Sequence, residues 1–205
     1  MPKLHFALRT ATAGLALMAA AAPAQERPAR AEARSQLLGP MAELIENRVG
    51  VWDVVARLQL TPSASPVLIA AIAEHRIVGG RWLVSELRSV DGMDGFHGLG
   101  VNGFDSRAGH YTGYWIDGSR DFAIPVTGRY DPATRTFRTT SIERRSDGST
   151  IEVQSETVTI GPDREETTFT APDANGRPYV RMRLTYSRRG PSAGEQPSYR
   201  SETGT

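Results

Sequence analysis

The chain has 205 residues with 24 basic and 23 acidic side chains, which gives a formal net charge of +1. This balance excludes a strong general attraction to nucleic acid or anionic lipid and favours neutral partners. Cysteine is absent, which excludes disulfides, a thiolate metal site and a lipidated cysteine anchor. The length predicts one domain whose hydrophobic core alone has to hold the fold.

The N-terminal segment is typical of a secretory signal peptide. Lys3 and Arg9 supply positive charge, an apolar run follows over 10–22, and small residues at 22–24 offer a cleavage site before Gln25. The run is shorter than the roughly 20 residues with which a helix crosses a membrane. We therefore predict cleavage near Ala24-Gln25 and a periplasmic or secreted protein without a stable membrane anchor.

The remaining chain divides into three parts, preceded by the signal peptide over 1–24. A polar leader over 25–34 is expected to be flexible, a single domain covers 35–189, and a polar tail over 190–205 is expected to be disordered. Within the domain, Ser35 is positioned to cap a short helix that ends before Gly50. The apolar residues of this helix recur at helical spacing: Leu37, Leu38, Met41, Leu44 and Ile45.

Ten strand-like stretches then follow at short, regular intervals without a helical pattern between them. They lie at 51–60, 68–78, 81–89, 96–104, 110–116, 122–130, 136–144, 150–160, 165–170 and 179–187. Turn dipeptides such as Asp117-Gly118 and Asn175-Gly176 separate many of them. In the last stretch the alternation predicts Val180, Met182, Leu184 and Tyr186 inward and Arg181 outward.

One turn pattern occurs twice, at 104–111 and at 130–137. In each copy an aromatic residue precedes an Asp, and a second aromatic residue follows seven positions after the first. Asp105 and Asp131 can bond the backbone two residues further on, and the aromatic residues favour strands that pair across the turn. The repeat therefore predicts two successive hairpins with the same loop.

Strands joined in series by tight turns predict an all-β fold. We expect a single closed antiparallel up-and-down β-barrel of about eight to ten strands, because closure removes both edges of the sheet. The regular hairpins favour the barrel over a Greek-key sandwich. The short N-terminal helix is expected to plug or flank one mouth.

Several motifs, in their order along the chain, resemble a bacterial domain family of unknown function with a calycin-like (lipocalin-like) β-barrel. These motifs lie at 50–52, 75–83, 96–105, 114–117, 128–131 and 184–188, within roughly 37–189. The resemblance implies a barrel related in shape to lipocalins and fatty-acid-binding proteins, but no established reaction. Haem-binding barrels of similar shape keep an axial His near the last strand, and 179–189 contains none, so no cofactor is expected.

The stretch Gly98–Gly103 matches the letters of the dinucleotide-binding motif G-x-G-x-x-G. That motif needs a helix N-terminus behind it to bind pyrophosphate, whereas a hairpin turn follows here. Glycines that let a barrel strand curve are the better interpretation. The three histidines after the signal peptide, His75, His97 and His110, lack metal-ligand spacing, so no metal site is predicted.

The densest amphipathic cluster covers 114–117. Tyr114 or Trp115 can line a pocket, with Asp117 or Arg81 as its polar contact, and His97 lies in a glycine-rich strand nearby in sequence. These five are the predicted ligand-binding residues, and no catalytic residue is assigned. In the structural alternative, the cluster is a packed strand whose Asp117 caps the next turn, and Arg81 pairs with an acid.

Three functions remain open. The leading one is an exported soluble barrel that binds a small hydrophobic or amphipathic molecule, because barrels of this size can enclose one ligand. The second is an isomerase- or hydratase-like enzyme that uses His97 or Asp117 as general base. The third is a structural or interaction module with a filled core, which a large exposed apolar patch or a dimer seam would indicate. The sequence leaves the oligomeric state open.

Overall fold

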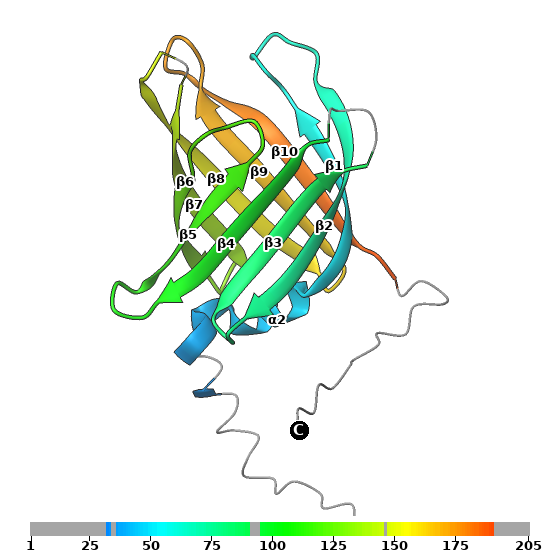
Figure 1. Cartoon of the computed structure of the whole chain (residues 1–205), viewed down its shortest axis with the longest axis vertical. Coiled ribbons are helices and arrows are strands. Elements are labelled where there is room, and N and C mark those ends of the chain that lie inside the picture. The colour runs from blue at the N-terminus through cyan, green and yellow to red at the C-terminus, as the bar shows by residue number, and fades with distance from the viewer. Residues whose placement is uncertain (1–31, 34–35, 91–94, 146, 191–205) are drawn as a thin grey trace, which may run out of the picture.

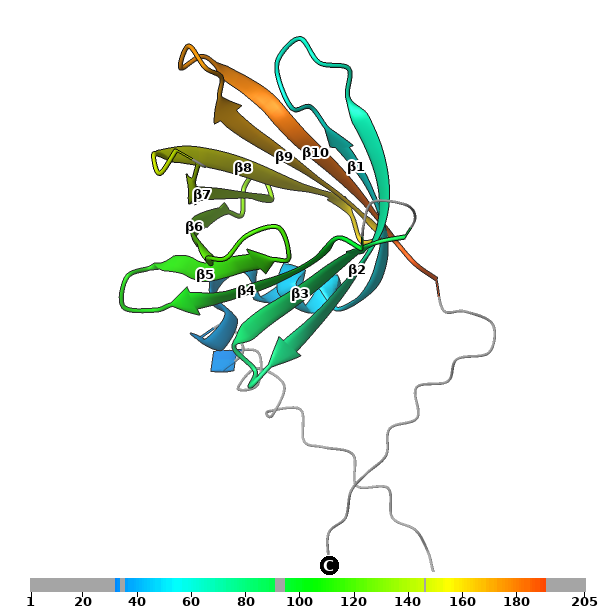
Figure 2. The same cartoon turned by 45° about the horizontal axis from the view of Figure 1, so that its top comes forward.

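The structure is a computed structural model that describes residues 32–33, 36–90, 95–145 and 147–190. Ten antiparallel strands close into one barrel, in which each strand pairs with its neighbours in sequence and β1 pairs with β10 (Figures 1 and 2). The predicted closed up-and-down barrel with a short N-terminal helix is confirmed.

The strands lie within two residues of their predicted ranges, because the hydrophobic alternation and the turn residues agree along the whole domain. Their bounds are β1 Gly50–Leu58, β2 Val67–Val78, β3 Trp82–Ser89, β4 His97–Asp105, β5 His110–Asp117, β6 Ile124–Asp131, β7 Thr136–Arg144, β8 Thr150–Gly161, β9 Arg164–Pro172 and β10 Pro178–Arg188. A helical segment precedes them and contains the 3-10 turn η1 (Gly39–Met41) and the helix α2 (Ala42–Arg48).

Several predictions fall outside the described residues: the signal peptide over 1–24, most of the leader over 25–34, the cap at Ser35 and the tail beyond Gly190. Within the described part of the chain, no helix has the length and hydropathy needed to cross a membrane.

The two copies of the repeated turn build the closed end of the barrel. As predicted, Phe104 pairs across its turn with Tyr111, and Tyr130 pairs with Phe137. Asp105 Oδ1 accepts hydrogen bonds from two backbone N–H groups of its turn, at 2.9 and 3.0 Å. The ring centres of Phe104 and Phe137 lie 5.0 and 5.3 Å from that of Tyr111, so the hairpins share one aromatic floor.

The helical segment covers this aromatic floor. Leu38, Met41 and Ile45 are buried against it, together with Leu83 of β3. The Tyr111 hydroxyl donates a hydrogen bond to the Leu38 carbonyl at 2.8 Å and accepts one from the Met41 N–H at 2.7 Å. Figure 1 shows the helix lying across one end of the barrel, which we call the helix end; the opposite end is the open end.

Gly39 allows this close approach between the helical segment and the floor. Its φ of +69° lies in the left-handed region, and a Cβ at this position would overlap the ring of Phe104. No other residue type satisfies both conditions without displacing the floor.

Arg188 joins the last strand to the first strand and to the helix. Its guanidinium donates to the Val49 carbonyl at 3.0 Å, pairs with Asp163 at 2.9 Å and lies 4.3 Å from the centre of the Trp52 ring. Trp52 itself is 1% exposed and donates its indole N–H to the Arg48 carbonyl at 2.8 Å. These contacts fix the seam at which the sheet closes on itself.

One strand departs from the predicted alternation. The pairing of β10 with β9 shifts between Val180 and Met182, as in a β-bulge. Val180 is therefore 40% exposed instead of facing inward, and Arg181, expected outward, reaches an inward-facing carboxylate, Glu143 of β7. The inward predictions for Leu184 and Tyr186, which lie beyond the bulge, are confirmed by their burial in the core.

Replacing Tyr111 with Phe tests how the helix is held. The variant leaves the Leu38 carbonyl and the Met41 N–H without their buried partner, so the free energy of unfolding should fall by about 1–3 kcal/mol in urea titrations. Tyr114→Phe on the outer wall is the control, with an expected change within about 0.5 kcal/mol. Equal stability of Tyr111→Phe and the native protein would contradict this role of the hydroxyl.

Candidate functional site

The barrel interior is packed near the helix and accessible towards the open end. Near the helix, the inward-facing Trp52, His75 and Tyr111 are only 1–3% exposed. Towards the open end, many inward-facing side chains are partly exposed, although they lie within a closed wall. They are Leu58, Ile69, Leu87, Val126, Thr139, Ser141, Phe169 and Met182, whereas the inward-facing Ile124, Val153 and Ala171 are buried. Because the wall around them is closed, their exposure points to the open end, so this half of the interior is the candidate site; Figure 2 turns this end towards the viewer.

The two sides of the accessible interior differ in polarity. On one side, Leu87, Phe169 and Met182 pack against the apolar cluster of β1, β2 and β10. On the other side, β7 and β8 turn hydroxyl groups inward: Thr139 bonds Ser155 at 2.6 Å, and Ser141 donates to a backbone carbonyl at 3.3 Å. A filled core would carry apolar side chains on both sides, so this lining suits a molecule with an apolar and a polar face.

Trp115 lies flat against the wall instead of filling the interior. Gly98 and Gly100 of the neighbouring strand β4 make room for it, because a Cβ on Gly98 would overlap the indole and one on Gly100 would come within 3.3 Å. The indole N–H donates to Asp117 Oδ2 at 2.8 Å. These glycines explain part of the G-x-G-x-x-G match, since β4 continues as a strand and no helix follows it.

Charged side chains form a network across the open end. Arg181 of β10 pairs with Glu143 of β7 at 3.0 Å, although two strands separate them in the sheet. Arg120 in the β5–β6 turn bonds Asp117 and lies 3.5 Å from the same Glu143. The network therefore bridges opposite parts of the rim and places two guanidinium groups, each about one quarter exposed, beside the mouth.

Asp117 is the most enclosed member of this network, with a side chain that is 1% exposed. Burial acts to raise the pKa of its carboxyl group, but hydrogen bonds from Ser119 and Trp115 and the charge of Arg120 outweigh it. The pKa is therefore held below its ordinary value. A carboxylate stabilised in this way is a fixed structural anion, and it suits a general base at neutral pH poorly.

His75 lies below the accessible half and is 3% exposed. Its Nδ1 lies 2.8 Å from the Ser85 hydroxyl, while Nε2 is buried without a hydrogen-bond partner among the described residues. Burial, followed by the charges of Arg48 and Arg188, lowers the pKa of His75 to about 2. The imidazole is therefore neutral at physiological pH.

The five predicted ligand-binding residues do not form one site. Trp115 and Asp117 face the interior near the open end, as the pocket interpretation requires. Tyr114 is 58% exposed on the outer wall, and His97 is exposed at the start of β4, where it pairs with an outer carboxylate. Arg81 is exposed in the β2–β3 turn at the helix end.

Sequence reasoning missed Arg120, Glu143 and Arg181. For Glu143 a signal existed: β7 places Phe137 inward, and alternation then places 139, 141 and 143 inward as well. Arg181 could not be found in this way, because the bulge changes the side to which it points. The Arg120 position depends on the path of a turn, which periodicity does not describe.

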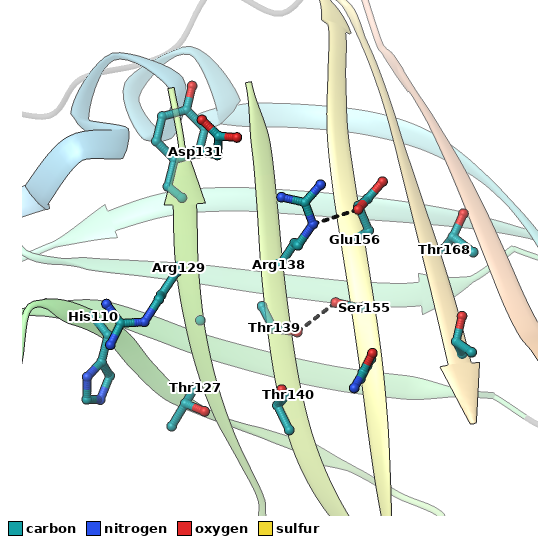
Figure 3. A pocket seen from close by; sticks show the side chains of 14 residues that line it. His110, Thr127, Arg129, Asp131, Arg138, Thr139, Thr140, Ser155, Glu156 and Thr168 are labelled. Carbon is teal, nitrogen blue, oxygen red and sulfur yellow. Dashed lines mark hydrogen bonds and ion pairs between the residues drawn. The ribbon is translucent and has the colours of Figure 1, made fainter. Parts of the chain in front are cut away.

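A second hollow, of about 1000 Å³, lies on the outer wall over β6–β9 (Figure 3). Its outward-facing lining is Thr127, Arg129, Arg138, Thr140, Gln154, Glu156, Thr168 and Thr170. Arg138 pairs with Glu156 at 2.8 Å, and both side chains are about half exposed. The side chains around this groove are polar or charged, whereas small-molecule pockets are lined mainly by hydrophobic and aromatic side chains. Nowhere in the described ranges do three His, Asp or Glu side chains gather in a way that could hold a metal ion.

Comparisons with known proteins agree with the fold. Residues 39–188 match a family described as "Protein of unknown function (DUF1579)", which confirms the resemblance seen in the sequence motifs. Among solved structures, the fold is similar to that in the crystal structure of Rv2717c from M. tuberculosis, with a TM-score of 0.56 and 14% sequence identity. The match covers 75% of this chain and 99% of the Rv2717c chain. At this identity the likeness concerns the fold alone. No curated protein matches the sequence.

Replacing Gly98 with Ala tests how Trp115 is seated. The added methyl group should push the indole off the wall and weaken its bond to Asp117, which lowers the free energy of unfolding by about 1–3 kcal/mol and shifts the tryptophan emission. Gly118→Ala is the matched control, because a Cβ there meets nothing within 4 Å. If both variants keep the native emission and stability, Trp115 does not depend on Gly98.

His75 predicts a specific dependence of stability on pH. Its folded pKa of about 2 lies far below the ordinary value of 6.5. As the pH falls below 6.5, His75 becomes protonated in the unfolded chain but stays neutral in the folded chain. This difference should lower the free energy of unfolding by up to about 1.4 kcal/mol per pH unit. We expect urea titrations between pH 7.5 and about pH 5 to show that the free energy of unfolding depends less steeply on pH for His75→Gln than for the native protein. Parallel slopes would show that His75 takes up its proton in the folded state.

Proposed function

The chain belongs to the DUF1579 family of proteins of unknown function, and we propose from its own geometry that it binds one small amphipathic molecule inside the barrel. The observation that supports this proposal is the accessible half of the interior, which has an apolar side and a hydroxyl-lined side. The ligand enters at the open end, because the helix covers the other end.

In the proposed complex, the apolar part of the ligand lies against Leu87, Phe169 and Met182, where burial of apolar surface contributes roughly 25 cal/mol per Å². Its polar groups meet the hydroxyls of Thr139 and Ser141. Trp115 adds a rigid aromatic surface, because Gly98, Gly100 and Asp117 already hold its ring in place. A preformed wall of this kind lowers the ordering cost of binding.

The predicted signal peptide suggests where the protein would bind its ligand. If the signal peptide is removed as the sequence predicts, the barrel meets its ligand in the periplasm or outside the cell. The proposed role is then that of a soluble carrier or scavenger of a small amphipathic molecule.

The geometry gives less support to an enzyme that uses His97 or Asp117 as general base. His97 lies on the outer wall, away from the accessible interior. Asp117 is engaged by Trp115 and Arg120 and has a lowered pKa. The two groups therefore cannot act on the same bound substrate.

A pair of adjacent substitutions on β7 tests the binding proposal. Ser141→Phe places a ring in the accessible interior, whereas Thr140→Phe places the same ring on the outer wall. With 1-anilinonaphthalene-8-sulfonate as a fluorescent amphipathic probe, Ser141→Phe should weaken binding at least about tenfold, and Thr140→Phe should leave it within about twofold. Circular dichroism and urea titrations confirm that both variants fold.

Native mass spectrometry of the protein purified without detergent provides a second measurement. A co-purified small molecule that Ser141→Phe reduces and Thr140→Phe retains would support the proposal. Absence of any such molecule, together with probe binding that neither substitution changes, would contradict it.

A further inference from the structure

We propose that the outer wall over β2–β5 is a self-association surface, through which two copies of this chain form a dimer with two-fold symmetry. This proposal is independent of ligand binding in the interior. It concerns an apolar patch on the outside of the barrel, which we call the outer apolar patch: Val78, Trp82, Val84, Val101 and Tyr114.

The outer apolar patch consists of cross-strand neighbours that face away from the interior. Val78 pairs with Trp82, and Val84 pairs with Val101, which pairs with Tyr114. The residues line a hollow of about 340 Å³ with Val84, 7% exposed, at its base. Val78 and Trp82 are each 41% exposed, and Tyr114 is 58% exposed. Single exposed apolar residues are common, but a contiguous patch with two aromatic rings marks an interaction surface.

Trp82 is held in a defined position on this surface. Its ring lies flat on Gly103 of β4, where a Cβ would come within 2.5 Å of the indole. The aromatic ring is therefore ordered before a partner arrives, which reduces the entropy lost on binding. Tryptophan and tyrosine are also the residues that contribute most often to binding energy at the centre of protein interfaces.

Charged side chains lie on both sides of the patch along the strands. On the side nearer the open end, Glu74 and Glu86 lie directly opposite each other on β2 and β3. On the side nearer the helix end, Arg81 is exposed in the β2–β3 turn. Glu86 already pairs with His97 at 3.0 Å and with Arg88 at 3.4 Å, and the exposed Arg76 lies between Glu74 and Val78 on the outer face of β2. Within the described part of the chain, Glu74 and Arg81 have no ion-pair partner.

One two-fold arrangement satisfies both the apolar and the charged groups. With the axis crossing the strands between Trp82 and Val84, Trp82 of one copy packs on Val84 of the second copy. The same rotation brings Glu74 towards the second copy's Arg81, so that this pair of opposite charges forms twice, once on each side. This arrangement has the apolar centre and charged rim of a protein interface.

The segment preceding the barrel suits the patch less well than a second copy does. Leu37 lies beside Gly80 in the β2–β3 turn, so this segment begins close to the patch. Residues 25–34, however, are rich in Arg, Glu, Ala and Pro and contain no large apolar side chain. They cannot match the aromatic groove, whereas a second patch supplies Trp82 and Tyr114 in return.

Sedimentation equilibrium of the protein purified after expression of the full chain tests this proposal. Between about 1 and 200 µM the native protein should pass from monomer to dimer, and Trp82→Ala or Tyr114→Arg should weaken the dimer at least about 30-fold. Thr140→Arg, on the opposite outer wall, is the control and should dimerise like the native protein. Tyr114→Arg keeps the test valid if Trp82→Ala fails to fold, and circular dichroism checks all variants.

A charge exchange tests the orientation of the two copies. Glu74→Arg and Arg81→Glu should each weaken the dimer about five- to tenfold, because each brings like charges together across the axis, and the double variant should recover most of the loss. A monomer throughout the concentration range, including one whose leader covers the patch, would overturn the proposal. A dimer that is insensitive to the patch substitutions would overturn it too, as would a double variant without recovery.

Discussion

The hydroxyl of Tyr111 is the contact on which the rest of the architecture depends. It serves two backbone groups of the helical segment at once, through bonds of 2.7 and 2.8 Å, while its ring packs between Phe104 and Phe137. Burial raises the pKa of Tyr111 to about 12, so the group stays protonated and keeps donating at physiological pH. Because this contact anchors the cover of one end, the barrel has a packed half and an accessible half.

Much of this fold follows from local signals in the sequence. Alternation places the strands, and the repeated Asp turns set the pairing of Phe104 with Tyr111 and of Tyr130 with Phe137. The bulge at Val180 could not be predicted from alternation, because it adds one residue to β10 in its pairing with β9 and so interrupts the two-residue period. For the same reason Arg181 was expected outside and instead reaches Glu143.

Of the five predicted ligand-binding residues, only Trp115 and Asp117 lie at the candidate site, because neighbouring residues on a strand point to opposite sides of the sheet. Tyr114 and Trp115 are neighbours in sequence but point to opposite sides of the wall. Trp115 and Asp117, two positions apart, therefore share the interior, whereas Tyr114 belongs to the outer surface. Sequence analysis identified the amphipathic cluster but could not say which of its members face the interior, since that depends on pairing with β4 and β6.

The glycines of strand β4 determine where two tryptophans lie, one on the inner and one on the outer side of the barrel wall. These glycines seat one indole on each side, with Trp115 over Gly98 and Gly100 and Trp82 over Gly103. The two rings lie at different levels of the strand, because Val101 and Asn102 separate Gly100 from Gly103. A side chain added to β4 would therefore disturb one tryptophan only: Trp115 on the inside for Gly98 and Gly100, and Trp82 on the outside for Gly103.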